Sequence, residues 1–385
     1  MLIIKNILLL IIDSFLTLVS FFIKLDDDTV IITSTNNDNF NFNSKYFFLY
    51  IKEKYNNKKI FFIINDEKKR QQLNTTIGNH FINNKNLKNK YICLKAQYWI
   101  SSTFELPLLS IFSNRKRIII HLGHGIPLKR IGLMEKDISK LQYINRYIKT
   151  RAFTYVICYS EEFKPIMQNI FKNDRIQFLC LGQPRNDVIR IDRDLSVNKL
   201  AKKLSLKIDL NSKLILYCPT WRPFDKTVFF PFKDVNLEEL TQFLSTNNFY
   251  LFLRAHPFYP AKYPENFKFS NRIINLSSLY INDITEYLSS FDHLITDYSS
   301  IYIDYLLLDK KISFIPYDFS LYNSNVGFTI DYNEYTPGNK ITSQKEFLED
   351  LVNEDNYYPC RHKARSYFNI KEKNCEEISE FIFKK

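Results

Sequence analysis

The stretch that decides the fold is Arg117-Ile-Ile-Ile-His-Leu-Gly-His-Gly-Ile-Pro-Leu-Lys-Arg-Ile-Gly132. It opens with a β-branched apolar run that is typical of a buried strand. Its last twelve residues hold three of the chain's seven glycines and two of its six histidines. Because glycine allows close backbone approach to a ligand, this cluster at a strand end indicates the ligand-binding edge of an open α/β sheet.

The loop itself indicates catalysis on an anionic substrate. His124 can accept or donate a proton near neutral pH. Gly125 leaves room for a ligand beside the backbone. Lys129 and Arg130 offer positive charge to an anion. His121 either orients His124 or ends its strand.

On both sides of this stretch, short apolar runs alternate with amphipathic segments in a βαβ rhythm. The strands expected before the polar stretch 190–211 are 29–33, 60–64, 118–120, 154–158 and 177–181, with helices at 45–55, 139–151 and 161–171. The strands expected after it are 214–217, 250–253, 272–275, 293–296 and 312–315. The stretch 190–211 suits a linker, although part of it has a helical pattern. The rhythm predicts an α/β fold with two doubly wound sheets and functional loops at the strand ends.

Composition fits a globular protein with an anionic partner. The 385 residues are 45% hydrophobic, and 53 Lys and Arg exceed 41 Asp and Glu by twelve. The basic residues are spread along the chain and no nucleic-acid-binding motif appears, so we expect no nucleic-acid partner. The six cysteines form no CxxC pair, which favours small buried side chains in a reducing compartment over a zinc site or disulfides.

The N-terminal segment 1–25 is expected to be a membrane-associating helix. The run Ile7–Ile23 is nearly all apolar, yet it is short for a spanning helix. Asp13 near a bilayer centre would cost about 2.5–3.5 kcal/mol. We therefore expect a peripheral or monotopic helix on the cytoplasmic face of the cell membrane. A spanning helix and an ordinary buried first helix are the alternatives.

Two loops of the second half carry candidate ligand-binding residues at strand ends. In Cys218-Pro-Thr-Trp-Arg222, the tryptophan and arginine either grip a base and a phosphate or anchor the core. In Arg254-Ala-His-Pro257, the proline restricts the backbone around His256. That histidine is either a positioned acid, base or phosphate donor, or a helix cap.

The stretch Leu294-Ile-Thr-Asp-Tyr-Ser-Ser-Ile-Tyr-Ile-Asp304 gives the sharpest signal for phosphate binding. A strand ends in a polar turn, and the following helix starts with hydroxyls that can donate to phosphate oxygens. A plain serine cap is the alternative. It leaves unexplained the two carboxylates, which can hold donors in place. The residues singled out here are Thr296, Asp297, Ser299, Ser300 and Asp304.

The segment Gly182-Gln-Pro-Arg-Asn-Asp187 follows the last strand of the first half. Arg185 and Asn186 can contact a ligand, or they can fix the hinge between the two halves of the chain.

Taken in order, these motifs resemble those of the CDP-glycerol glycerophosphotransferase family of teichoic-acid primases and polymerases. The resemblance runs over residues 90–380 and includes Phe314-Ile-Pro-Tyr-Asp318 and Gly327-Phe328. One departure is Ile126, where the family usually has a threonine. The motifs that carry the resemblance are 124–132, 182–187, 218–222, 254–256 and 295–304.

The resemblance implies a GT-B-like pair of Rossmann-like domains. The acceptor side would span 26–190 and the CDP-donor side 191–365, with a C-terminal helix over 366–385 packing back on them. The implied activity moves an alditol phosphate, glycerol phosphate first, from a CDP-alditol to a hydroxyl of a lipid-linked or polymeric acceptor and releases CMP. A GT-B glycosyltransferase using a nucleotide sugar and a non-catalytic membrane-associated binding protein are the alternatives.

By the same resemblance, His124 and His256 are the essential pair, and we expect His124 to be the general base. The alternative is that the two histidines exchange roles, which leaves the overall reaction unchanged. His256, Arg254 and Arg222 would stabilise the charge developing on the pyrophosphate. No cofactor is firmly predicted, and Mg²⁺ on the donor pyrophosphate is the one ion left open. The residues expected to bind substrate are Gly125, Lys129, Arg130, Arg185, Asn186, Thr220, Trp221, Arg222, Arg254, Thr296, Asp297, Ser299, Ser300 and Asp304.

Overall fold

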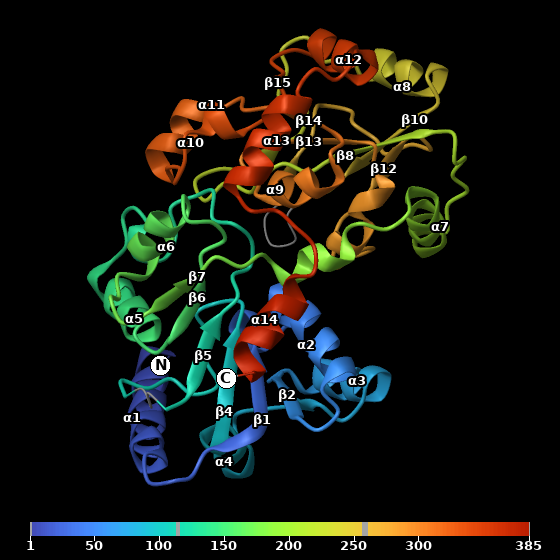
Figure 1. Ribbon diagram of the computed structural model, residues 1–385. Coiled ribbons are helices and arrows are strands. Elements are labelled where there is room, and N and C mark those ends of the chain that lie inside the picture. Colours follow the sequence, from blue (N-terminus) through green and yellow to red (C-terminus); the bar gives the residue numbers. More distant parts are fainter. Residues whose placement is uncertain (1, 113–115, 256–260, 385) are drawn as a thin grey trace. The chain divides into compact units, whose positions relative to one another are not determined.

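The computed structural model describes residues 2–112, 116–255 and 261–384, with side chains from residue 10 onward. The chain forms two compact units (Figure 1). The first comprises Met1–Ile126, Ile131–Asp187 and Lys371–Lys385. The second comprises Pro127–Arg130 and Val188–Ile370. The chain therefore enters the second unit for four residues, returns, and crosses again after Asp187.

The first unit is built on a seven-stranded parallel sheet in the order β3-β2-β1-β4-β5-β6-β7. Residues 29–33 of β1 are all buried, as expected of a strand covered on both faces. The strands are β1 Asp26–Thr33, β2 Lys59–Ile63, β3 Phe81–Ile82, β4 Ala96–Ser101, β5 Ile118–His121, β6 Tyr155–Ile157 and β7 Gln177–Leu179.

Helices connect these strands and cover the sheet. In Figure 1, α5 and α6 lie on one side of the first unit's strands and α2 and α3 on the other. The C-terminal helix α14 packs against α2. The helices are α1 Leu2–Ser20, α2 Phe42–Lys54, α3 Glu67–Ile77, α4 Leu87–Lys95, α5 Lys140–Thr150, α6 Lys164–Phe171 and α14 Asn374–Phe383.

The second unit repeats this plan with a six-stranded parallel sheet in the order β12-β10-β8-β13-β14-β15, and β9 pairs with β11 beside it. Aromatic residues such as Phe229, Phe230 and Phe347 fill one core of this unit. Its strands are β8 Lys213–Tyr217, β9 Thr227–Val228, β10 Phe249–Leu253, β11 Ala261–Lys262, β12 Ile273–Asn275, β13 His293–Thr296, β14 Lys311–Phe314 and β15 Asn339–Lys340.

Seven helices of the second unit complete the described part of the chain. They are α7 Arg193–Leu204, α8 Leu237–Thr246, α9 Ile301–Tyr305, α10 Phe319–Asn325, α11 Tyr332–Tyr335, α12 Gln344–Val352 and α13 Tyr358–Tyr367. Helix α7 occupies much of the stretch 190–211, which confirms the helical pattern seen in part of this stretch.

Strand order reverses once in each sheet, and such switch points are where open α/β sheets bind ligands. The first sheet reverses between β1 and β4, and the second between β8 and β13. Loops 218–222 and 297–300 follow β8 and β13 directly. The predicted α/β fold with parallel sheets is confirmed, and the two sharpest motifs of the second unit flank its switch point.

From residue 10 onward, helix α1 is amphipathic in the reverse sense, with polar residues inward and apolar residues outward. Asp13 is buried in an ion pair with Lys90 of α4, and its Oδ2 accepts the backbone N–H of Leu109 at 3.1 Å. The other buried polar residues of this face are Ser14, Thr17 and Ser20. The exposed apolar residues are Ile11, Ile12, Phe15, Leu18 and Val19, followed by Phe21 and Phe22 just beyond the helix. No helix within the described residues is long and apolar enough to span a membrane.

All six cysteines are free thiols. Cys93, Cys158 and Cys375 are buried, as the sequence predicts for small apolar side chains. Cys360 is exposed on α13, so that prediction is wrong for this residue, which lies on the outer face of an amphipathic helix.

Candidate functional site

In the first unit, the site begins at His121, the last residue of β5. Its ring is buried against Phe104, Phe153 and Phe171. Burial, with a smaller contribution from His124, lowers the pKa of His121 to about 3. The neutral ring accepts the N–H of Gly123 at Nδ1, at 3.1 Å. His121 therefore ends its strand and shapes the turn that leads to His124.

Two glycines let the chain turn sharply around His124. Gly123 has φ +74° and Gly125 has φ +136°, values that L side chains rarely adopt. Tyr159, which follows β6, braces the same turn because its hydroxyl donates to the Gly125 carbonyl at 3.3 Å. A Cβ on Gly123 would lie 2.2 Å from that hydroxyl oxygen. Glycine at 123 is thus required by both backbone and packing.

His124 is exposed at the tip of this turn, while its surroundings are fixed. The Arg185 Nη1 donates to the His124 carbonyl at 3.0 Å. The rings of Phe42 and His124 lie 5.4 Å apart. Arg185 and Asn186 are both buried, and among the described residues the Asn186 carboxamide has no hydrogen-bond partner. The sequence did not mark Phe42 or its neighbour Asn43, because helix α2 carries no recognisable motif.

Residues 127–130 belong to the second unit, although they follow His124 directly. Lys129 forms an isolated antiparallel bridge with Phe328. The Arg130 N–H donates to the Gly327 carbonyl at 3.1 Å, and its side chain is exposed. The glycine-rich motif is therefore divided, with its histidine in one unit and its basic pair in the other.

Lys129 is half-buried. Its ammonium lies 6.0 Å from the centroids of both the Trp221 and Tyr322 rings. Burial lowers the pKa of Lys129 to about 8, with Asp297 opposing that shift and Arg222 adding to it. A lysine with a pKa of about 8, next to an indole, suits a ligand that combines a base with phosphate.

Arg222 is fully buried and its donors are used within the second unit. Nη1 pairs with Asp297 Oδ2 at 2.8 Å and also donates to the Thr220 carbonyl. Nε and Nη2 bind Asp318 at 2.8 and 2.9 Å. Burial opposes the charge, yet the two carboxylates raise the pKa of Arg222 above its ordinary value. The guanidinium is stacked by three rings, those of Tyr298, Tyr317 and Tyr322.

Asp297 joins the two loops at the switch point. Its Oδ1 accepts the N–H groups of Thr220 at 2.7 Å and Tyr298 at 2.5 Å. The Thr296 hydroxyl donates to the Cys218 carbonyl at 2.7 Å. The Thr220 hydroxyl is buried and has no partner within the described residues. Thr296 and Asp297 thus support the site, because their polar atoms hold the backbone of the loop that follows the neighbouring strand β8.

The groups that remain open to a ligand lie around this frame. Trp221, Ser299 and Ser300 are half-buried. The Ser300 side chain makes no cap hydrogen bond to α9. Asp304 is buried on α9. The two serines, the indole and Lys129 are therefore partly accessible, and Arg130 is the exposed member of the predicted set in this unit.

Arg254 follows β10 and organises a neighbouring loop. Its Nη1 donates to the carbonyls of Leu276 at 2.9 Å and Ile281 at 2.8 Å, and its Nη2 donates to Asn282 at 3.2 Å. Burial lowers the pKa of Arg254. His256, predicted as the second essential histidine, lies outside the described residues.

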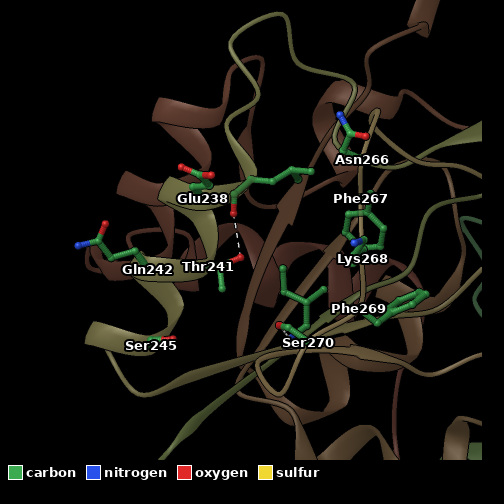
Figure 2. A pocket seen from close by; sticks show the side chains of 11 residues that line it. Glu238, Thr241, Gln242, Ser245, Asn266, Phe267, Lys268, Phe269 and Ser270 are labelled. Atoms are coloured by element: carbon green, nitrogen blue, oxygen red, sulfur yellow. Dashed lines mark hydrogen bonds between the residues drawn. The ribbon is translucent and has the colours of Figure 1, made fainter.

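A groove of about 520 Å³ lies elsewhere in the second unit, between α8 and the segment before edge strand β12. Figure 2 shows Glu238 and Thr241 of the helix on one side and Phe267 and Phe269 on the other. Of the described site residues, none lines this groove. It is thus separate from the switch point.

The described residues also offer no metal centre. Within them, no group of three or more His, Cys, Asp or Glu side chains could hold a metal ion. Asp297 and Asp318 are both engaged in ion pairs with Arg222.

Comparison with known proteins gives a consistent result. A family model described as CDP-glycerol:poly(glycerophosphate) glycerophosphotransferase matches residues 15–384. A teichoic acid glycerol-phosphate transferase of Staphylococcus aureus is 27% identical over 307 residues, which cover 75% of this chain and 77% of that protein. A teichoic acid glycerol-phosphate primase of Bacillus subtilis is 29% identical over 286 residues, covering 70% and 69%.

Among solved structures, the wall teichoic acid polymerase TagF aligns with a TM-score of 0.77 at 23% sequence identity. The alignment covers 99% of this chain and 95% of that one. This likeness concerns the fold.

Proposed function

The chain belongs to the CDP-glycerol:poly(glycerophosphate) glycerophosphotransferase family, and from this premise we propose its reaction. It is a transferase that moves glycerol phosphate from CDP-glycerol to a hydroxyl of a lipid-linked or polymeric teichoic acid acceptor and releases CMP. The single observation that carries the proposal is the divided loop, which holds an exposed histidine in one unit and a cation beside an indole in the other.

The chemistry is a displacement at phosphorus. The acceptor oxygen attacks the phosphorus that bears glycerol, and the bond from that phosphorus to the bridging oxygen breaks. The electron pair of the broken bond leaves with CMP. His124 takes the hydroxyl proton as the new bond forms, a role that contributes about 10²–10⁴-fold in rate. We assign this role to His124 because it is exposed on a turn that Tyr159 and Arg185 brace.

In the second unit, we propose that the switch point binds the donor. Lys129 neutralises pyrophosphate charge, Trp221 stacks on cytosine, and Ser299 and Ser300 donate to phosphate oxygens. The buried side chains of Arg222, Asp297 and Thr296 hold the two loops that carry Trp221, Ser299 and Ser300. We retain His256 as a second group on the phosphate.

We further propose a GT-B-like pairing of the two units. The first unit would serve the acceptor and the second the donor. Two parallel α/β sheets and the likeness of the fold to a teichoic acid polymerase support this arrangement.

We also propose that α1 places the protein on the cytoplasmic face of the cell membrane. Exposing apolar side chains to water is unfavourable by about 1.5–3 kcal/mol for each large one, compared with burying it. Phe15 is 64% exposed and Ile11 60% exposed, whereas Asp13 and Thr17 face the protein. A lipid surface is the solvent in which this reversed arrangement is favourable.

The reaction is tested by CMP release from purified protein given CDP-glycerol or CDP-ribitol with a lipid-linked glycosyl acceptor. Acceptor-dependent CMP that is lost in folded His124→Ala supports the proposal and identifies the alditol. Release of a nucleoside diphosphate from a UDP-sugar would instead identify a glycosyltransferase. Near-normal turnover by His124→Ala would overturn the assignment of the base.

The membrane proposal is tested by sedimentation with vesicles that contain anionic lipid. We expect Phe15→Asp to lose vesicle binding. Leu195→Asp on α7 is the matched control, because Leu195 is 66% exposed in the other unit. Equal vesicle binding by wild type and Phe15→Asp would contradict the proposal.

A further inference from the structure

We propose that Asn43 is a positioning residue for His124, through a single carboxamide that fixes the backbone on which the histidine stands. This inference rests on the proposed function of His124. Asn43 lies in the first turn of α2 and is fully buried. It belongs to a part of the chain where no motif marks a functional residue.

The carboxamide of Asn43 contacts the backbone just before His124 and the backbone of Arg185. Its Nδ2 donates to the carbonyls of Leu122 at 3.0 Å and Gly123 at 2.8 Å, the two residues that precede His124. Its Oδ1 accepts the backbone N–H of Arg185 at 3.0 Å. The Arg185 side chain then donates to the His124 carbonyl at 3.0 Å. These four bonds close a ring around the backbone of 122–124.

Only a side-chain amide can make this set of contacts. An aspartate of the same shape would accept from Arg185 but would turn a carboxylate oxygen toward two carbonyl oxygens. An alanine would leave the buried carbonyls of Leu122 and Gly123 without their side-chain donor. The residue type is thus dictated by the loop it holds.

The backbone of Phe42, just before Asn43, is held in an unusual conformation. Phe42 has φ +56°, a left-handed conformation that is a genuine outlier for a bulky residue. That conformation begins α2 and accompanies a ring contact between Phe42 and His124 of 5.4 Å. Local strain of this kind persists where the surrounding contacts fix the chain. Phe42 therefore contacts the ring of His124, and Asn43 holds the backbone that leads to His124.

Asn43 also lies where a ligand of the first unit is expected. Helix α2 follows β1, and the first sheet reverses its strand order between β1 and β4. The next residue, Ser44, is hydrogen-bonded to Ser102 after β4. The carboxamide thus links the switch point of the sheet to the turn that carries the base.

The test is the isosteric substitution Asn43→Asp, with Asn74→Asp as the matched control. Asn74 makes a similar two-sided carboxamide contact, with the backbone of Phe81 in the same unit, but it does not touch the loop. We expect Asn43→Asp to lower kcat about 10²-fold, as a misplacement near 1 Å does. The KM for CDP-glycerol should stay unchanged, because the donor half-site lies in the other unit.

The pH profile provides a readout that a merely structural role would not move. A carboxylate added beside the turn favours the protonated imidazole. The acid limb of the kcat profile of Asn43→Asp should therefore move to higher pH, whereas that of Asn74→Asp should stay in place.

Amide hydrogen exchange at 123–125 tests the geometry without any reaction. Faster exchange there in Asn43→Asp and Asn43→Ala than in Asn74→Asp, with exchange in the rest of the first unit alike in all three variants, would support the inference. Unchanged exchange together with wild-type kcat would overturn it while leaving the proposed function intact. Absence of CMP release in the wild type would instead count against the proposed function, and hydrogen exchange would still decide the role of Asn43.

Discussion

The guanidinium of Arg222 and the carboxylate of Asp297 form a 2.8 Å ion pair with both side chains buried. The pair joins the loop after β8 to the loop after β13, across the switch point of the second sheet. Asp318 and three tyrosine rings surround the same guanidinium. Arg222 therefore supports the site from inside, and a donor meets the side chains around it.

Substitution of Arg222 by alanine is expected to lower stability as well as activity. Breaking a buried pair by removing one partner costs about 3–5 kcal/mol, because the other charge stays buried without compensation. Thermal unfolding of Arg222→Ala should show this loss. Lys363→Ala, which removes the exposed pair with Glu334, is the control and should unfold like the wild type. An Arg222→Ala protein of normal stability but without donor binding would instead indicate that Arg222 contacts the phosphate.

Lys129 should control how donor use depends on pH. Burial, partly opposed by Asp297, lowers the pKa of Lys129 to about 8. Below that pH the ammonium is charged and can bind pyrophosphate, and above it the charge is lost. Since kcat/KM reports the free enzyme, kcat/KM for CDP-glycerol should fall as pH rises through about 8.

Lys129→Arg is the matched control for this profile, because arginine stays charged throughout the range. We expect the alkaline fall to disappear in Lys129→Arg. Lys129→Ala should raise the donor KM at every pH while leaving thermal unfolding close to that of the wild type. An alkaline fall that persists in Lys129→Arg would assign the titration to another group.

The sequence predicts those parts of the fold that depend on local pattern. The apolar runs at 214–217, 250–253 and 293–296 are strands within one residue of the expected bounds. Strand β4 was missed, although it lies in the middle of the first sheet. Its segment Ala96-Gln-Tyr-Trp-Ile-Ser101 lacks a continuous aliphatic run and follows directly on helix α4. Tertiary burial decides the conformation of such a segment.

The sequence predicts which loops carry the candidate site. It does not predict which unit each residue belongs to, or which residues support the fold. Spacing places Lys129 five residues after His124, yet the two residues belong to different units. Arg222 and Arg254 have the residue type of phosphate ligands, and their donors bind carboxylates and carbonyls within the fold. Asn43 had no sequence signal, because its contacts join positions about 80 and 142 residues away along the chain.

The buried pair between Asp13 and Lys90 should anchor α1 to the first unit. Replacing Lys90 with methionine leaves Asp13 buried without its partner, which disfavours the packed helix. We expect Lys90→Met to lower the midpoint of thermal unfolding and to speed proteolysis within α1. Lys88→Met, which like Lys90→Met lies on α4, is the control, because Lys88 is exposed. Equal proteolysis of the two variants would show that α1 is held by other contacts.

Gly123 and Tyr159 should be coupled in stability. Alanine at 123 would adopt a left-handed backbone, at about 1–2 kcal/mol, and its Cβ would lie 2.2 Å from the tyrosine oxygen. In Gly123→Ala with Tyr159→Phe, that oxygen is gone and the nearest ring atom lies 3.4 Å away. The clash is then relieved, but the backbone cost stays.

Tyr159→Phe alone should lose about 1 kcal/mol, the net value of one hydrogen bond. A denaturant-unfolding cycle should therefore give a double variant more stable than the sum of the two single losses, by about 0.5–3 kcal/mol. Strict additivity would mean that the loop moves away from Tyr159 when the methyl group is added.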